Sequence, residues 1–194
     1  VNPDAGKKWS ELNNNHRNLF WYNKIGSIGF IGYSGGATLA ESLPDFEEAC
    51  SYMAGAGVDH VILLGHWDGS GMGCAADMTV PAVFSKIQTL PGCNIGDRLK
   101  AFDGHTHCNH VQDTSSAGAN SIFMIGGHGM AGCSQYGFAY IESSGGQLRV
   151  YYFEERSATS DNYAAILACV REKGIANCKE HASTWLAMGS ETDL

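Results

Sequence analysis

The sequence has few charged residues, few prolines and no long apolar run. Charged residues make up 16% of the 194 residues and there are 4 prolines, whereas globular chains carry roughly 25% charged residues. The 25 glycines follow no fixed period, so a collagen-like chain and a proline-rich linker are excluded. No apolar stretch approaches the about 20 residues that cross a membrane. Hydrophobic residues still make up 44%, which is enough to bury a core.

Basic residues are also scarce. Twelve lysines and arginines stand against 20 aspartates and glutamates, and the net charge is −8 with histidine neutral. Phosphate backbones and anionic membrane surfaces both require a basic face. We therefore expect no nucleic-acid-binding surface and no docking on an anionic membrane surface. The lack of a long apolar run predicts no membrane span.

The seven cysteines contain no C-x-x-C pair, so a zinc ribbon or a thioredoxin-like motif is not supported. Their wide spacing is typical of disulfides in an exported protein, which predicts a secreted, extracellular location. Cys74 and Cys93 flank an expected helix, and Cys169 and Cys178 flank the expected helix stop at residues 173–174. Inert buried thiols are the alternative. An odd number leaves at least one cysteine unpaired within the chain.

Strand and helix patterns alternate, then give way to a meander and a final helix. Apolar runs bounded by glycine predict the strands, and apolar residues at helical spacing predict the helices. This order indicates an α+β or α/β fold with a mixed sheet flanked by helices. We expect one domain over residues 1–194, with a C-terminal helical extension over 160–194. The expected strands are 27–33, 58–64, 99–102, 121–125, 136–142 and 147–154, and the expected helices are 44–56 (with Ser42 as a possible cap), 80–90 and 160–173.

Glycine and histidine follow two of these strands. Gly65 and His66 come directly after residues 58–64, and the run Gly-His-Thr-His over 104–107 comes after residues 99–102. His105 and His107 alternate along the chain, so both imidazoles can point to one region. Imidazole suits zinc, iron and manganese. These motifs favour a metal site of His66, His105 and His107, the alternative being loop histidines that bind backbone carbonyls.

Other polar residues flank the same loops. Asp68 and Asp103 could orient the imidazoles, or could be ordinary turn residues. Asn109 could line the mouth of a site, and His128 lies in a glycine run where backbone N–H groups can bind an anion. We treat Asn109 and His128 as candidate substrate-binding residues, with exposed loop residues as the alternative.

Gly65-His66 followed by the Gly-His-Thr-His run resembles the last two signature blocks of the calcineurin-like metallophosphoesterases, and the resemblance covers roughly residues 20 to 155. It implies the C-terminal half of a four-layer αββα sandwich. In that family two divalent metals (Zn, Mn or Fe) bind phosphate oxygens and generate the attacking hydroxide. By resemblance His66 and His105 would ligate one metal and His107 the other.

The family's earlier motifs, D-x-H, G-D-x-x-D and G-N-H-[DE], do not precede His66. We therefore expect that Val1 lies just after the central motif and that this chain is the C-terminal portion. The general acid would then lie in the absent half. Three histidines hold at most one metal, so a second metal needs the missing half as a partner.

Three functions remain open on the sequence. The first is metal-dependent hydrolysis of a phosphate mono- or diester by a secreted enzyme, of which this chain is one part. The second is an inactive, phosphoesterase-like extracellular protein that self-associates, since a fragment leaves a sheet edge or face to be covered. The third is a mononuclear zinc hydrolase that uses Asp68 or Asp103 to activate water.

Overall fold

The computed structural model describes residues 20–66, 77–104, 110–114, 118–124, 136–144, 147–155 and 161–181. The chain divides into two compact units, residues 1–101 and 102–194, and each is described by itself. The expectation of one domain over residues 1–194, with a C-terminal helical extension over 160–194, stays a prediction.

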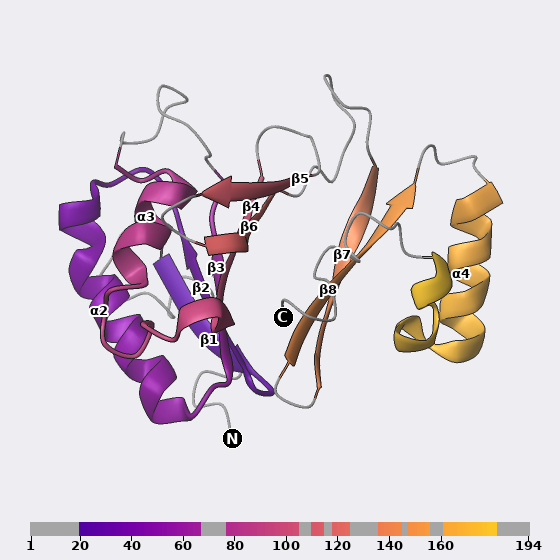
Figure 1. The fold of residues 1–194 in the computed structure, drawn as a ribbon, viewed down its shortest axis with the longest axis horizontal. Coiled ribbons are helices and arrows are strands. Elements are labelled where there is room, and N and C mark those ends of the chain that lie inside the picture. Colours follow the sequence, from indigo (N-terminus) through magenta and orange to yellow (C-terminus); the bar gives the residue numbers. More distant parts are fainter. Residues whose placement is uncertain are drawn as a thin grey trace. The chain divides into compact units, whose positions relative to one another are not determined.

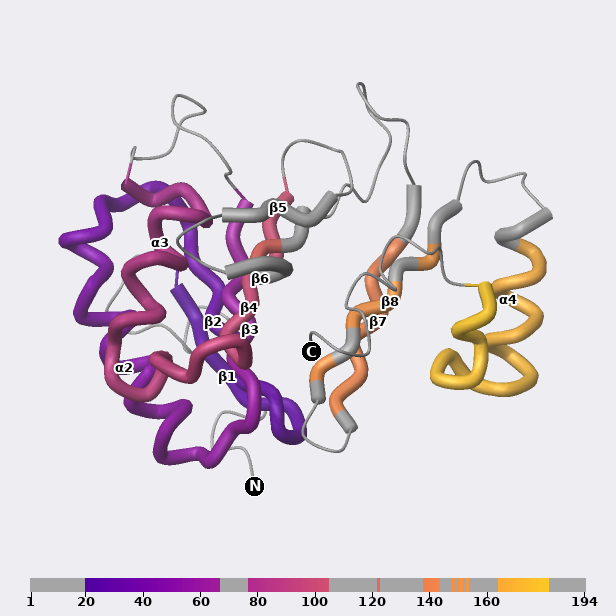
Figure 2. The backbone as a smooth tube through the Cα atoms, viewed as in Figure 1, coloured from indigo at the N-terminus to yellow at the C-terminus, as the bar shows by residue number. Residues whose placement is uncertain are grey.

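The first unit is built on four strands. They are β1 (Phe20–Ile25), β2 (Ile28–Tyr33), β3 (His60–Leu64) and β4 (Leu99–Asp103), and they lie side by side in that order. β1 and β2 form an antiparallel hairpin around residues 26–27, and β2 and β3 are parallel (Figure 2). The mixed sheet with helices that the sequence predicts is therefore confirmed.

Two helices lie in the connections after β2 and β3. α2 (Leu39–Ala56) joins β2 to β3, and α3 (Val80–Ile87) follows β3, with the short 3₁₀ turn η1 (Gly96–Arg98) ahead of β4. Both helices cover the same face of the sheet (Figure 1). Because the chain steps across the sheet in one direction, right-handed crossovers place successive helices on one face.

α2 begins earlier than the sequence predicts. Thr38, not Ser42, is the N-cap: its side chain accepts a hydrogen bond from the backbone of Glu41, and the Glu41 carboxylate accepts one from the backbone of Thr38. This reciprocal capping box satisfies two N–H groups of the first turn. Pro44 was expected near the start of the helix, but it lies inside it.

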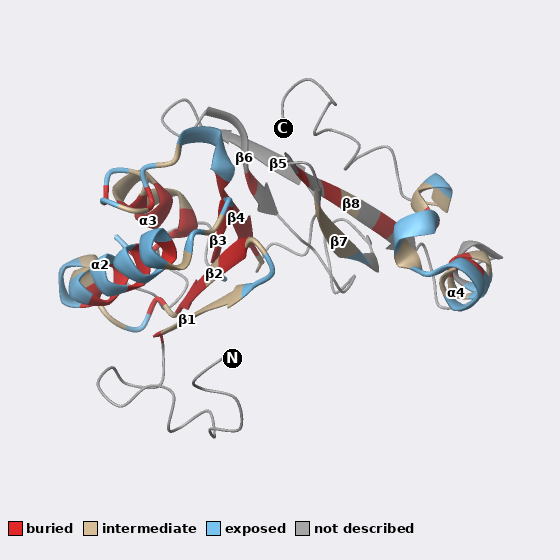
Figure 3. Ribbon diagram, turned by 90° about the horizontal axis from the view of Figure 1, so that it is seen from below, coloured by how far each residue is buried: buried red, intermediate tan, exposed pale blue. Residues whose placement is uncertain are grey.

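The core of the first unit lies between the sheet and these two helices (Figure 3). Ile31 of β2 and Val61 and Leu63 of β3 are fully buried, as are Phe46 and Met53 of α2. The ring of Phe46 packs edge-on against Phe20 and Tyr33, with centroids 4.9 and 5.6 Å away. The apolar residues at helical spacing that the sequence pattern identifies therefore do face the sheet.

A disulfide between Cys50 and Cys93 ties α2 to the segment after α3, with Cα atoms 5.2 Å apart. Of the two disulfide candidates that flank the expected helix, Cys93 is paired, with Cys50 and not with Cys74, and Cys74 lies outside the described residues. The helix pattern places Cys50 on the buried face of α2 but does not show which loop passes over it. Gly92 has a φ of +89°, and a Cβ there would collide with the Cys50 carbonyl oxygen, so only glycine fits beside this disulfide.

The second unit contains two antiparallel strand pairs. β5 (His110–Thr114) pairs with β6 (Gly118–Met124), and β7 (Tyr136–Ser144) pairs with β8 (Gln147–Glu155). The hairpin of β7 and β8 confirms the prediction from the Ser-Ser-Gly-Gly run between them. β5 was not expected as a strand, since its sequence, HVQDT, has one large apolar residue.

α4 (Asp161–Lys173) begins where the sequence predicts and is followed by two 3₁₀ turns, η2 (Ile175–Asn177) and η3 (Lys179–His181). Ile166 and Cys169 of α4 pack with Phe153 of β8 and with Cys178 in a buried cluster. Cys169 and Cys178 form a disulfide with each other. This confirms the prediction that these two cysteines take part in disulfides. No helix in the described ranges is long and apolar enough to cross a membrane.

Candidate functional site

Both histidine motifs start at the residue after a strand. β3 ends at Leu64 and is followed directly by Gly65 and His66, and β4 ends at Asp103 and is followed directly by Gly104. In parallel sheets, ligand sites form beyond the carboxyl ends of the strands. The structure thus confirms that a strand ends directly before each of the two histidine motifs.

Gly65 is packed so closely that it admits no side chain. A Cβ at this position would collide with the side chain of Val80, at the start of α3, and would lie 2.8 Å from the hydroxyl oxygen of Tyr33, at the end of β2. His66 follows this packed glycine and is exposed. The chain therefore leaves the sheet at a fixed point and presents His66 to solvent, where an imidazole can reach a ligand.

The segment before α3 is held to this edge by two hydrogen bonds. The Tyr33 hydroxyl donates to the carbonyl oxygen of Met78 (3.2 Å), and the backbone N–H of Leu39 donates to the Asp77 carboxylate (3.1 Å). A carboxylate at a helix N-terminus is favoured by the helix dipole. The N-terminus of α2 is therefore satisfied by this chain's own carboxylate, which fixes the edge of the sheet near Gly65.

β4 carries two buried ionisable side chains. Asp103 is 1% exposed and Lys100 is 2% exposed. Burial lowers the pKa of the Lys100 ammonium, and the nearby Asp97 carboxylate partly opposes that shift. Asp103 stands two residues before His105 in the chain, as expected of a residue that orients an imidazole, and this role stays a prediction.

The remaining predicted site residues lie outside the described residues. They are His105, His107, Asn109, His128 and Asp68. The metal site of His66, His105 and His107 therefore stays a prediction, with His66 the one ligand whose position is described. Its donor type and its exposure fit a first-row metal ion.

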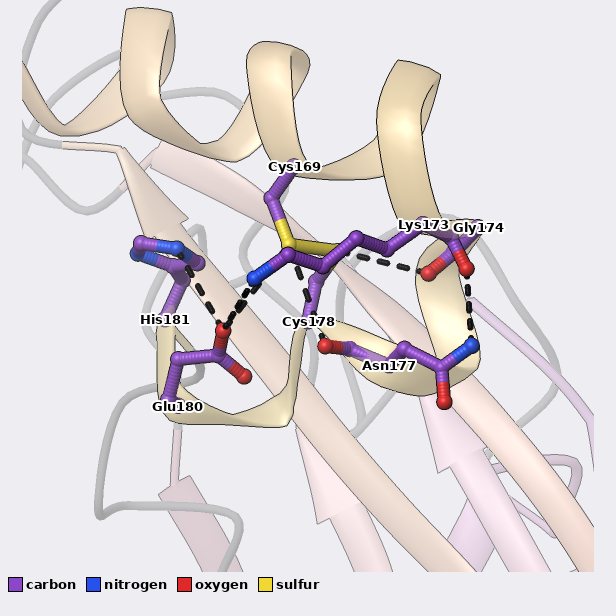
Figure 4. The surroundings of a disulfide bond; sticks show 7 residues. All are labelled: Cys169, Lys173, Gly174, Asn177, Cys178, Glu180 and His181. Carbon is purple, nitrogen blue, oxygen red and sulfur yellow. Dashed lines mark hydrogen bonds and ion pairs between the residues drawn. A yellow bond between two sulfur atoms is a disulfide. The ribbon is translucent and has the colours of Figure 1, made fainter.

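A second cluster of ligand-type side chains lies at the end of α4 (Figure 4). We name it the α4 clip, and it consists of Cys169, Cys178, Glu180 and His181. Glu180 Oε1 lies 3.9 Å from Cys169 Sγ and 3.9 Å from His181 Nε2. A disulfide sulfur has no proton to donate, so the first distance is a contact rather than a hydrogen bond. Cys169, Glu180 and His181 each offer a ligand atom, and these atoms lie within 4.8 Å of one another.

The α4 clip was not expected as a site. No sequence pattern singles out His181, which lies beside Glu180 and is 28% exposed at its side chain. A hydrogen bond from its own backbone N–H lowers the pKa of the Glu180 carboxyl, and Lys173 and His181 add to this effect. The signal that could have revealed the cluster is the order Cys-x-Glu-His at residues 178–181, which begins nine residues after Cys169.

Comparisons of the chain with family models, curated proteins and solved structures give no match. The function is therefore argued from the residues themselves.

Proposed function

We propose that this chain is the C-terminal portion of a secreted, metal-dependent phosphoesterase, and that His66, His105 and His107 are metal ligands. The observation that carries this proposal is the start of both histidine motifs at the first residue after a strand, at Gly65 and Gly104. This is the arrangement that the resemblance to calcineurin-like metallophosphoesterases implies. Two disulfides, and the lack of a membrane-spanning helix in the described ranges, are compatible with an extracellular protein.

A bound divalent metal supplies Lewis-acid activation of the phosphate ester and of water. The role of this chain is to fix the ligands. Packing around Gly65 fixes the point at which His66 leaves the sheet, and the buried Asp103 precedes the other two histidines. Asn109 and His128 are the candidate substrate contacts. A carboxylate-bridged second metal requires the D-x-H and G-N-H-[DE] motifs on a further polypeptide segment.

The test is metal binding and hydrolysis by the purified protein. The purified chain should bind zinc or manganese, and His66→Ala should lose that metal. When the segment with the missing motifs is also present, we expect hydrolysis of p-nitrophenyl phosphate or its bis-ester to depend on the added metal and to be lost in His66→Ala. His16→Ala is the matched control, because no ligand role is assigned to that histidine. Intact mass under denaturing, reducing conditions shows whether a second polypeptide supplies the missing motifs. Metal-independent hydrolysis, or full activity in His66→Ala, would exclude the proposal.

A self-associating protein without catalysis is the second candidate. The observation that favours it is the position of β1 at the outer edge of its sheet, with Ile25 at its end 69% exposed. An edge strand offers unpaired backbone groups to another chain. This function predicts polymers of the chain alone with metal content well below one ion per chain, and sedimentation velocity with metal analysis distinguishes it from the first candidate.

A further inference from the structure

The residues of the α4 clip are brought together by a short stretch of chain. Cys169 lies in the last turns of α4, Cys178 follows η2, and Glu180 and His181 belong to η3. The Cα atoms of the two cysteines are 5.8 Å apart. Asn177 donates a hydrogen bond from its side-chain amide to the carbonyl oxygen of Lys173 (2.7 Å), which holds η2 against the end of α4. The cluster therefore depends on local contacts and not on the proposed phosphoesterase site.

We propose that the α4 clip binds one zinc ion through its four side chains when its disulfide is reduced. With the disulfide intact there is no thiolate, and the clip holds no metal. The same residues thus provide two alternative crosslinks between the end of α4 and the segment that follows it. One is the disulfide and the other is the zinc ion with its ligands. This site uses none of His66, His105 and His107, so its test is independent of the test of the proposed function.

The donor set suits zinc. Two thiolates, one imidazole and one carboxylate are ligands that zinc takes in four-coordinate sites. Thiolate ligands also favour zinc over the harder cations magnesium, calcium and manganese. Lys173 Nζ lies 3.7 Å from Glu180 Oε1, and its positive charge offsets the net charge of −1 on a zinc ion with these ligands.

The spacing of the ligand atoms is close to what zinc requires. Ligands about 2.0–2.3 Å from a tetrahedral zinc ion lie about 3.3–3.8 Å from one another. The sulfur of Cys169, the carboxylate of Glu180 and the imidazole of His181 already have ligand atoms within 4.8 Å of one another. Both Glu180 and His181 have solvent-accessible side chains that can move by the remaining distance. The sulfur of Cys178 is bonded to the sulfur of Cys169, so reduction leaves two thiols side by side at this position.

The redox step balances with a phosphine as reductant. A water-soluble trialkylphosphine gives two electrons to the sulfur–sulfur bond and becomes the phosphine oxide, with its oxygen taken from water. The two protons of that water go to the sulfurs, which become thiols. Each thiol loses its proton when it binds zinc. Zinc binding therefore releases two protons per site and leaves the neutral imidazole and the carboxylate as the other two ligands.

The test is site-resolved alkylation of the full chain. The protein is reduced with the phosphine, incubated with or without zinc and treated with iodoacetamide, and the labelled cysteines are identified by peptide mass spectrometry. We expect zinc to slow labelling of Cys169 and Cys178, with Cys50 and Cys93 as internal comparisons. Cobalt in place of zinc should give a thiolate-to-metal charge-transfer band, which is absent in the oxidised protein.

Two variants keep both cysteines and test the other ligands. His181→Ala and Glu180→Gln should weaken zinc affinity at the clip by about tenfold to a hundredfold, since loss even of groups that only orient a ligand has effects of that size. The matched control is Glu172→Gln, which removes the charge of an exposed glutamate on α4. This variant should bind zinc as the unaltered chain does. The proposal is overturned if zinc does not protect Cys169 and Cys178 in the reduced protein. It is equally overturned if His181→Ala and Glu180→Gln are protected as well as the unaltered chain.

Discussion

At the scale of single residues, two glycines show where the fold tolerates no side chain. A Cβ at Gly65 would meet Val80 and Tyr33, and a Cβ at Gly92 would meet the backbone of Cys50. Glycine richness in the sequence indicates tight turns, but it does not separate these packed positions from open ones such as Gly55, which has nothing within 4 Å of the added atom. Which glycines are obligatory depends on contacts between distant segments.

We expect Gly65→Ala to lower the free energy of unfolding by about 1–3 kcal/mol, because it overpacks a filled position. The matched control is Gly55→Ala, inside α2. That change should raise the free energy of unfolding by roughly 0.5–1 kcal/mol through helix propensity. Urea unfolding followed by circular dichroism measures both. Equal effects of the two substitutions would show that Gly65 is not packed as described.

At the scale of elements, apolar runs bounded by glycine predict β2, β3, β4 and the hairpin of β7 and β8. β1 was missed because its partners lie far along the chain: Tyr22 packs its ring on Tyr52 and donates a hydrogen bond to Glu48, both on α2. The sequence predicts the start of α2 too late, because proline is common in the first turn of a helix, which favours a start close to Pro44. The capping box of Thr38 and Glu41 starts the helix before Pro44.

One ionic contact joins η3 to the hairpin. Lys179 Nζ donates a hydrogen bond to the Glu142 carboxylate of β7 and lies over the ring of Tyr151 of β8, 4.8 Å from its centroid. The hydrogen bond to Glu142 raises the pKa of Lys179 above its ordinary value of 10.5. A raised pKa means that folding favours the protonated lysine. The resulting stabilisation is fully present below the ordinary pKa and is lost as the pH rises through the raised pKa.

We expect Lys179→Met to lower the free energy of unfolding at neutral pH by up to about 1 kcal/mol, the range for a partly exposed ion pair. The difference from the unaltered chain should shrink once the pH exceeds the raised pKa of Lys179. Lys173→Met is the control, because the pair of Lys173 with Glu180 is more than half exposed on both sides. A difference that stays constant with pH would mean that the charge of Lys179 is not what stabilises this contact.

At the scale of the whole molecule, the chain has two compact units, and each contains a disulfide in its buried part. The use of cysteine in disulfides was predictable from composition, and so was the pairing of Cys169 with Cys178, which are close in sequence. The pairing of Cys50 with Cys93 was not, because it joins a helix to a loop 43 residues later.

Removal of the two disulfides should lower the free energy of unfolding by different amounts. Loop-closure entropy assigns about 4 kcal/mol to a crosslink that spans some 43 residues and about 3 kcal/mol to one that spans some 9. We therefore expect Cys50→Ser with Cys93→Ser to lower the free energy of unfolding more than Cys169→Ser with Cys178→Ser does. Chemical unfolding of the two double variants without reductant measures this. A larger loss from the second pair would contradict the entropic account.

The most direct test of the proposed metal site is the zinc and manganese content of the oxidised chain after equilibrium dialysis. Intact disulfides remove the α4 clip as a competing site. We predict one metal ion per chain in the unaltered protein and in His16→Ala, and a loss of that ion in His66→Ala. An oxidised chain that binds no metal, or a His66→Ala variant that binds as much as the unaltered chain, would contradict the assignment of His66 as a metal ligand.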